Sequence, residues 1–292
     1  MDKENNVSLS VIIPACNAEK SLSLLLNSLE MQSTKPLEII VIDDYSTDST
    51  PEIALKYRVQ LIKNSGKKGP AVSRNLGIRN SRGKILAFID ADCIAQKDWI
   101  ENILKEFSLL QTSVIMGKVE IPRSTFLGDV ISALGFPAGG HVGFENMWHV
   151  DKEGKTDHIS SCNFAMTQDT VIKVGFFDET FPYPGCEDVD YSIRCVKNGI
   201  PIYYKERVKI THPPRKGIRK FIKWHLLRGR SNYHLKRKIK KVGNLIALRA
   251  WSSKNICKKY IFDIKLPFII IFLLLSFILQ QIGYLLEKFK RV

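Results

Sequence analysis

The feature that most constrains the fold is the alternation of short apolar runs with segments of helical periodicity in the N-terminal third of the chain. Runs rich in β-branched residues occupy 9–15, 38–43, 59–63 and 84–90. Between the first two, Leu22, Leu25, Leu26 and Leu29 recur at the spacing of one helix face. Strands that alternate with helices form a mostly parallel sheet with right-handed crossovers. The sequence therefore predicts a Rossmann-like α/β fold with helices flanking a central sheet.

Three of these runs are followed by polar or acidic residues. They are residues 14–17, the pair Asp43 and Asp44, and the pair Asp90 and Asp92. Ligands of parallel α/β sheets bind beyond the carboxyl ends of the strands. We therefore expect the four carboxylates to lie along one rim of the sheet.

Asp90 and Asp92 are separated by a single small residue. In an extended chain both side chains would point to the same face, and two like charges so close together require a compensating cation. A hard divalent cation commonly takes one or two carboxylates plus the phosphate oxygens of its substrate. The alternative is an ordinary turn or cap, since Asp is frequent after strands.

Two further charged groups fit either ligand binding or helix capping. Lys67, Lys68 and Arg74 surround a Gly-Pro helix start, where cations could face a diphosphate. Glu187 and Asp188 stand at the beginning of a predicted helix, whose dipole favours ionised carboxylates.

These residues belong to five segments that resemble, in order and spacing, the family 2 inverting glycosyltransferases of the GT-A fold. The segments are SVIIPACNAEKSLSLLLNSLEMQSTKPLEIIVIDDYSTDST, GPAVSRNLGI, GKILAFIDADC, CNFAMTQDTVIKVGFFDE and CEDVDYSIRCVKNG. The resemblance covers roughly residues 8–204. It implies a GT-A fold, a nucleotide-sugar donor and a divalent metal.

The resemblance also implies which residues bind the donor. By position these are Pro14, Ala15, Asn17, Asp43, Asp44, Arg74 and Asp90. The loop that begins at Pro14 would pack on the nucleoside, and Asp44, with Asp43 beside it, would hydrogen-bond the base. Arg74 would lie near the nucleotide or sugar, and Asp90 would contact the ribose or sugar.

For the metal and the chemistry, the resemblance implies that Asp92, together with Asp90, coordinates Mn²⁺ or Mg²⁺ on the diphosphate. His212 lies where some GT-A enzymes place a metal-ligating histidine, although an unbound surface histidine is the alternative. In the Glu187-Asp188 pair, Asp188 matches the catalytic base that takes the proton from the acceptor hydroxyl. One carboxylate suffices as base, unlike the pair that a glycoside hydrolase uses.

Two positions depart from the family's pattern on the acceptor side. Many relatives carry Gly before the Asn of this segment, whereas this chain has Cys162-Asn163. A basic pair often follows, and here the residues are Thr167 and Gln168. The motifs therefore define the donor contacts better than the acceptor contacts.

The net charge of +15 is concentrated in one segment. Between Lys205 and Tyr260 there are nineteen Lys and Arg and one acid, Glu206. Cations interleaved with Trp224 and Tyr233 fit an anionic membrane surface, and nucleic-acid binding is the competing interpretation. The apolar stretch that follows favours the membrane, so no nucleic-acid partner is expected.

That stretch, residues 266–286, contains twenty-one residues without a charge, and a helix of this length reaches across roughly 30 Å of bilayer core. A helix in the membrane interface or in a protein core is the alternative, and Gln280, Gln281 and Gly283 count against a spanning helix. Cations are concentrated before it, so the positive-inside rule predicts a catalytic domain in the cytoplasm at the cell membrane. Six cysteines without a C-x-x-C pair agree with a reducing compartment.

The sequence thus predicts a catalytic domain over 1–204, a basic amphipathic membrane-surface segment over 205–262 and a transmembrane or membrane-embedded helix over 263–292. The predicted activity is metal-dependent, inverting sugar transfer from a nucleotide-sugar to a hydroxyl of a membrane-associated, lipid-linked glycan. One alternative is a nucleotidyltransferase, but PACNAEKS has no glycine for a phosphate loop. The other is a membrane- or nucleic-acid-binding protein with an inactive transferase-like domain.

Overall fold

The computed structural model describes residues 8–66, 68–109, 112–239 and 245–290. Lys67, one of the predicted cations, lies outside the described residues. The strands are β1 (Leu9–Ala15), β2 (Glu38–Asp43), β3 (Gln60–Lys63), β4 (Ile85–Ile89), β5 (Ile94–Ala95), β6 (Val114–Glu120), β7 (Lys155–Thr156), β8 (Asn163–Thr167) and β9 (Ile202–Thr211). The helices are α1 (Leu22–Glu30), α2 (Thr50–Ala54), α3 (Pro70–Asn80), α4 (Trp99–Leu109), α5 (Phe126–Ala133), α6 (Gln168–Val174), α7 (Glu187–Lys197), α8 (Ile218–Lys238), α9 (Leu245–Lys259) and α10 (Leu266–Lys288), with a short 3-10 helix at Phe144–Asn146.

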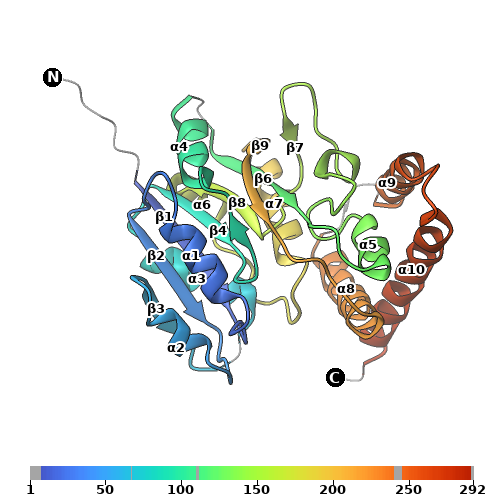
Figure 1. Ribbon diagram of the computed structural model, residues 1–292, viewed down its shortest axis with the longest axis horizontal. Helices are drawn as coiled ribbons and strands as arrows, with labels where there is room; N and C mark the ends of the chain where they lie inside the picture. Colours follow the sequence, from blue (N-terminus) through green and yellow to red (C-terminus); the bar gives the residue numbers. More distant parts are fainter. Residues whose placement is uncertain (1–7, 67, 110–111, 240–244, 291–292) are drawn as a thin grey trace.

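One mixed sheet forms the centre of the molecule, with strand order β3-β2-β1-β4-β8-β6-β9-β5 and β7 paired with β9 (Figure 1). The first four strands are parallel, as the alternating pattern predicts. The remainder is mixed, because β8 lies antiparallel between β4 and β6 while β9 runs parallel to β6. The parallel half carries the predicted acidic strand ends.

The predicted apolar runs at β1 and β4 form central strands because both faces of the sheet are covered there. All five residues of β4 are buried, and so are six of the seven in β1. On α1, the four leucines that define the predicted face are the buried ones. A strand covered on both sides buries every residue, which explains runs that are continuously apolar rather than alternating.

The predicted domain boundary at residue 204 falls inside a strand. β9 continues through it to Thr211 and pairs with β6, so Lys205, Arg207 and Lys209 belong to the sheet and not to a membrane-surface segment. The cations on this strand have their own partners, such as Glu106 for Lys205 and Glu120 for Lys209. The catalytic domain therefore extends further than the charge pattern predicts, because charge alone does not reveal sheet pairing.

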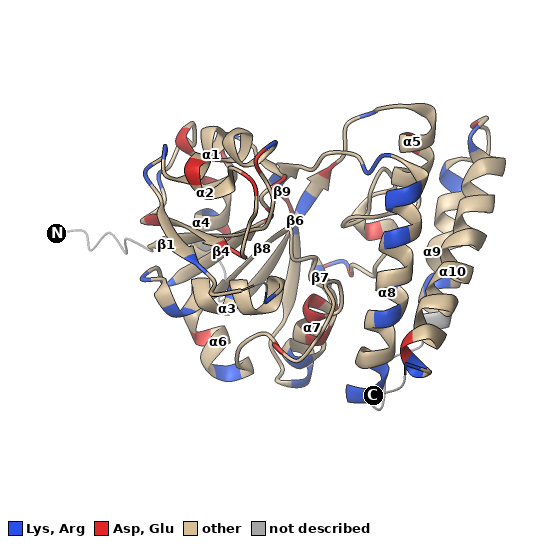
Figure 2. Ribbon diagram, turned by 90° about the horizontal axis from the view of Figure 1, so that it is seen from below, with Lys and Arg blue, Asp and Glu red and all other residues tan. Residues whose placement is uncertain are grey.

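Beyond the sheet, α8, α9 and α10 gather next to α5 in a helical layer (Figure 1). Small clusters of apolar residues join α5 to α8, α9 and α10. Cations occur along the length of α8, whereas α10 is apolar over most of its length (Figure 2). The predicted C-terminal segments are thus packed together and against the catalytic domain.

Candidate active site

A cavity of about 850 Å³ opens at the carboxyl ends of the parallel strands. Its other walls are formed by the start of α7, by the loop after α5 and by one face of α8. The predicted residues that line it are Pro14, Ala15, Asp44, Lys68, Arg74, Asp90, Glu187, Asp188 and His212. Its volume lies in the upper part of the range of small-ligand sites.

Asp44 holds the loop that precedes α3. Its carboxylate accepts hydrogen bonds from the backbone N–H groups of Lys68 (2.8 Å) and Gly69 (2.9 Å) and from the side-chain amide of Asn64 (2.9 Å). Gly69 has φ 91°, a conformation that glycine adopts without strain. Asp44 therefore shapes one wall of the cavity in addition to facing it.

Two of the predicted donor residues do not line the cavity within the described part of the chain. Asp43 is buried, and its carboxylate accepts a hydrogen bond from the backbone N–H of Ser46. Asn17 is exposed, and its side-chain oxygen accepts from the backbone N–H of Thr47 (2.8 Å). Asn17 therefore ties the loop after β1 to the loop after β2, whereas Asp43 supports the turn that follows its own strand, and a donor contact for either residue stays a prediction.

Arg74, on α3, joins the acidic end of β4 to the acidic start of α7. Its guanidinium binds Glu187 (3.0 Å) and Asp90 (3.3 Å), and its side chain is 3% exposed. Burial acts against the charge, but Asp90 and Glu187 outweigh it and raise the pKa of Arg74. This buried cation therefore compensates one of the four rim carboxylates, Asp90, and also Glu187.

Asp90 and Asp92 do not share a face, contrary to the expectation for an extended chain. β4 ends at Ile89, and the turn that follows is closed by a hydrogen bond from the backbone N–H of Cys93 to the carbonyl of Asp90. Asp90 consequently pairs with Arg74, whereas Asp92 faces His212. Burial raises the pKa of Asp90, with the charge of Asp92 adding to the effect and Arg74 opposing it.

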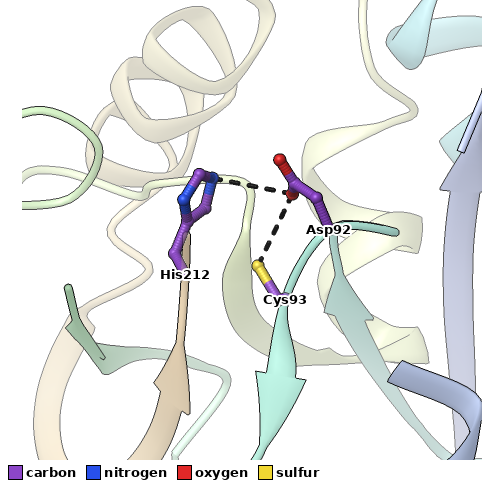
Figure 3. A group of neighbouring side chains, drawn as sticks. All are labelled: Asp92, Cys93 and His212. Carbon is purple, nitrogen blue, oxygen red and sulfur yellow. Dashed lines mark hydrogen bonds and ion pairs between the residues drawn. The ribbon is translucent and has the colours of Figure 1, made fainter. Parts of the chain in front are cut away.

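Asp92, Cys93 and His212 bring three potential metal ligands together (Figure 3). The His212 Nε2 lies 3.6 Å from the Asp92 Oδ1, and His212 Nδ1 lies 2.7 Å from the carbonyl of Pro213. Burial raises the pKa of the Cys93 thiol well above its usual range, and a hard divalent ion prefers a carboxylate oxygen to a thiol. Asp92 and His212 are therefore the preferred ligands of this group, and the predicted second carboxylate, Asp90, makes its ion pair with Arg74.

Glu187 and Asp188 occupy different environments at the start of α7. The Glu187 carboxylate accepts from Arg74 and from the backbone N–H groups of Gly185 (2.7 Å) and Cys186 (3.0 Å). Asp188 is less buried, and its carboxylate accepts from the backbone of Val189 (2.9 Å) and, at 3.4 Å, of Ser161. Asp188 is thus the member of the pair with capacity to accept a proton from a ligand.

In the acceptor-side segment, the departure at Cys162 and the neighbouring Asn163 have different structural roles. Asn163 is fully buried, accepts from the indole N–H of Trp99 and donates to the carbonyls of Lys118 and Val208. Cys162 lines the cavity, and burial raises the pKa of its thiol above the usual range. Asn163 therefore fixes the sheet, and Cys162 presents an uncharged surface to the ligand.

The sequence interpretation missed the contribution of α8 and of the loop before it. Arg215, Lys223, Trp224, Leu227 and Arg228 line the cavity. The last four recur at i, i+1, i+4 and i+5, so they share one side of a helix. This periodicity was a usable signal, but the excess of positive charge in the segment pointed to a membrane surface instead.

Comparisons with known proteins assign the family. The sequence profile described as glycosyl transferase family 2 matches residues 10–167, more than half of the chain. The chain belongs to glycosyl transferase family 2. This family 2 enzyme is 28% identical over 219 residues to Glycosyltransferase AglE of Haloferax volcanii. The aligned region covers 71% of the present chain and 67% of AglE. It is 28% identical over 228 residues to chondroitin synthase of Pasteurella multocida, a match to 66% of this chain but only 23% of that protein.

Solved structures establish the GT-A fold of the enzyme. The mannosyltransferase PcManGT from Pyrobaculum calidifontis, in complex with GDP-Man and Mn²⁺, superimposes with a TM-score of 0.64 at 15% identity and covers 97% of this chain and 88% of its own. S. aureus TarS 1-349 in complex with UDP-GlcNAc gives a TM-score of 0.53 at 16% identity, covering 87% and 73%. The predicted fold class, family and enzyme class, a glycosyltransferase, are confirmed.

Proposed function

We propose that this glycosyltransferase moves a sugar from a nucleotide-sugar donor to a hydroxyl of a membrane-associated, lipid-linked glycan, with inversion at the anomeric carbon. The observation that carries the proposal is one cavity lined by both Asp188 and His212, whose ring faces Asp92. Solved relatives bind GDP-Man with Mn²⁺ or UDP-GlcNAc, which supports a nucleotide-sugar donor.

Asp188 supplies the base in the proposed reaction. Its carboxylate takes the proton of the acceptor hydroxyl as the hydroxyl oxygen bonds to the anomeric carbon. The bond from that carbon to the diphosphate breaks on the opposite face, and the electron pair leaves with the nucleoside diphosphate. Glu187 keeps Asp188 in position, because the Glu187 carboxylate accepts three hydrogen bonds that fix the start of α7.

Asp92 and His212 would hold the predicted Mn²⁺ or Mg²⁺. A carboxylate suits either ion, and an imidazole nitrogen favours Mn²⁺ of the two because imidazole is a ligand for transition metals. When bound, the ion offsets the negative charge that develops on the departing diphosphate. Of the carboxylates in this region, Asp44 and Glu187 are already engaged by N–H donors, which leaves Asp92 available.

The donor site is tested by thermal shift on detergent-solubilised protein with UDP-, GDP- and dTDP-sugars, each with and without Mn²⁺. One donor class should raise the melting temperature only with metal, since ligand at 100 times Kd stabilises by about 2.7 kcal/mol. Asp92→Ala should abolish the shift, and Asp169→Ala, an exposed aspartate in the first turn of α6, should retain it. A metal-independent shift, or an unchanged shift in Asp92→Ala, would contradict the proposed metal site.

For membrane attachment, we propose that α10 lies along the bilayer surface and does not cross it. α10 runs beside α8 in the same direction: Phe272 contacts Phe221 near their starts, and Glu287 contacts His234 near their ends. A Cβ on Gly229 would come within 2.1 Å of the Gln280 carbonyl oxygen, so the helices approach closely. Any membrane position of α10 therefore includes α8.

α8 is poorly suited to the bilayer core. It carries eight Lys and Arg residues spread along its length. Each charge at the centre of a membrane helix costs on the order of 3 kcal/mol on insertion scales. The packed pair of α8 and α10 is better suited to the membrane–water interface, with α10 facing the lipid.

The outward face of α10 and the turn before it are strongly apolar. Exposed residues of this surface, the lipid face, are Ile261, Phe262, Ile264, Phe268, Ile271, Leu274, Phe277, Ile278, Leu285 and Phe289. Phe262 is 99% exposed, which is costly in water and favourable in a bilayer. Flanking cations such as Lys265 and Lys288 could meet anionic headgroups.

The orientation is tested with epitope tags at both termini in inverted membrane vesicles. An interfacial α10 leaves both tags accessible to added protease on the cytoplasmic side. A spanning α10 would protect the C-terminal tag while the N-terminal tag is cleaved, and that result would overturn the interfacial arrangement.

A further inference from the structure

The α8 side of the cavity carries positive charge that the chain itself does not neutralise. Arg215, Lys223 and Arg228 line the cavity. Within the described ranges, none of these three cations has a carboxylate at ion-pair distance, whereas Arg74 in the same cavity has two. The three residues are called here the α8 cation group.

Arg215 has unsatisfied hydrogen-bonding capacity inside the cavity. Its guanidinium stacks over the ring of Trp224 at 4.3 Å, and its buried Nη1 has no hydrogen-bond partner among the residues that the structure describes. A buried guanidinium nitrogen without a partner is costly, so its position is best explained by a ligand that accepts a hydrogen bond.

Arg228 lies beside the catalytic segment and among other cations. Its Nη1 would be 3.0 Å from a Cβ placed on Gly185, three residues before Asp188. Burial, followed by the charge of Arg228, lowers the pKa of both His158 and Arg249. The surroundings of Arg228 therefore disfavour positive charge, and a bound anion would relieve this.

The cavity wall next to these cations is apolar. Phe136, Pro137, Trp224 and Leu227 line it, and α8 packs on its other side against α10, which bears the lipid face. An anion joined to a hydrocarbon matches this combination of charge and apolar surface, and free phosphate matches only the charge.

We propose that the α8 cation group binds the phosphate of a phosphate-bearing lipid acceptor, and so places the acceptor beside Asp188. This inference rests on the proposed function. Two anions would then bind: the donor diphosphate beside Asp92 and His212, and the acceptor phosphate beside Lys223 and Arg228. Arg215 lies between the two positions, because it is close enough to Asp92 and Asp90 for their charges to act on it. Arginine suits this role because its planar group binds phosphate oxygens in pairs.

The test measures binding to the full-length protein in neutral detergent, with saturating nucleotide and Mn²⁺ present. The probes are farnesyl phosphate, farnesol and inorganic phosphate. Farnesyl phosphate should bind at least about ten-fold more tightly than either of the others, as expected for one charge-assisted contact. Equal binding of farnesol, or inorganic phosphate as tight as the lipid, would overturn the proposal.

Variants separate the site from general surface charge. Arg228→Gln should remove most of the preference for farnesyl phosphate, and Lys223→Gln, at an exposed position that tolerates change, should reduce it. Arg237→Gln, an exposed cation in the last turn of α8, serves as the matched control and should have no effect. An equal effect of the control would overturn the site.

Nucleotide binding distinguishes the two levels of failure. If Arg228→Gln weakened nucleotide–Mn²⁺ binding as much as lipid binding, the cations would serve the donor and this inference would fail alone. If the wild-type protein bound no nucleotide with Mn²⁺, the proposed function itself would fail.

Discussion

Replacing Arg74 by methionine should destabilise the enzyme far more than the same change at Arg79, which lies on the same helix. Both arginines make ion pairs. Arg74 and its partner Glu187 have side chains only 3% and 4% exposed, whereas Arg79 and Glu179 are 49% and 39% exposed. Methionine retains the apolar stem, so the comparison isolates the charge.

The magnitude follows from what each change leaves behind. Without Arg74, the buried carboxylate of Glu187 loses its cation, which costs about 3–5 kcal/mol in comparable sites. The Asp90 pair adds less, because its carboxylate is 34% exposed and screened by water. The exposed pair of Arg79 is worth about 1 kcal/mol at most. At roughly 2–4 °C per kcal/mol for a large domain, Arg74→Met should lower Tm by about 6 °C or more, and Arg79→Met by less than about 4 °C.

Thermal unfolding in detergent, followed by the intrinsic fluorescence of the four tryptophans, of which Trp99 is fully buried, measures this difference. Adding Glu187→Gln to Arg74→Met should recover part of the loss, because no unpaired charge then remains at that position. Equal Tm values for the two arginine variants, or a fully additive double variant, would refute the assignment of Arg74 as the buried cation of the site.

Three further predictions concern the helical layer and the base. Gly229→Ala would place its Cβ 2.1 Å from the Gln280 carbonyl oxygen, so it should lower Tm and weaken flotation with anionic vesicles. In the control Gly128→Ala, the new Cβ first meets a serine hydroxyl that can rotate, so neither Tm nor flotation should fall. Burial, reinforced by nearby arginines, lowers the pKa of His225 to about 3. The unfolded chain binds a proton there below about pH 6.5 and the folded chain does not, so His225 by itself should lower the free energy of unfolding by about 2 kcal/mol from pH 7 to pH 5. His158, whose pKa burial also lowers to about 3, adds to the fall, so urea unfolding at both pH values should show a fall about 2 kcal/mol smaller in His225→Gln than in the wild type. Asp188→Asn should reduce kcat by about 10² to 10⁴ with little change in donor KM in steady-state assays, and a kcat within about three-fold of wild type would exclude it as the base.

The local sequence pattern was sufficient to predict the limits of the parallel strands, because residues close together in the chain decide them. The predicted runs at 9–15 and 38–43 coincide with β1 and β2, and those at 59–63 and 84–90 differ from β3 and β4 by one residue at one or both ends. A strand that is buried on both faces is apolar along nearly its whole length, so the sequence shows where such a strand begins and ends. The acidic strand ends followed from the same logic, and Asp44 and Asp90 do line the cavity.

Side-chain direction at those strand ends was not predictable in the same way. Asp90 and Asp92 were expected to act together, but the chain leaves the strand at Ile89 and sends them to different partners. Asn17 and Asp43 were expected to contact the donor, but in the described part of the chain neither lines the cavity: Asn17 connects two loops and Asp43 supports the turn after β2. A turn of one or two residues redirects a side chain completely, and its geometry depends on contacts from other parts of the chain.

The sequence by itself determined the parallel half of the sheet, the family and the candidate base, because each depends on short segments whose order is fixed. Only the tertiary structure decided which charges meet. Arg74 reaches Glu187 across 113 positions of sequence, and α8 turns one side to the cavity and another to α10. Composition records how many cations the basic segment contains, but packing decides whether each one faces a carboxylate, a ligand or the membrane, since the energy of a charge depends on its surroundings and not on its place in the chain.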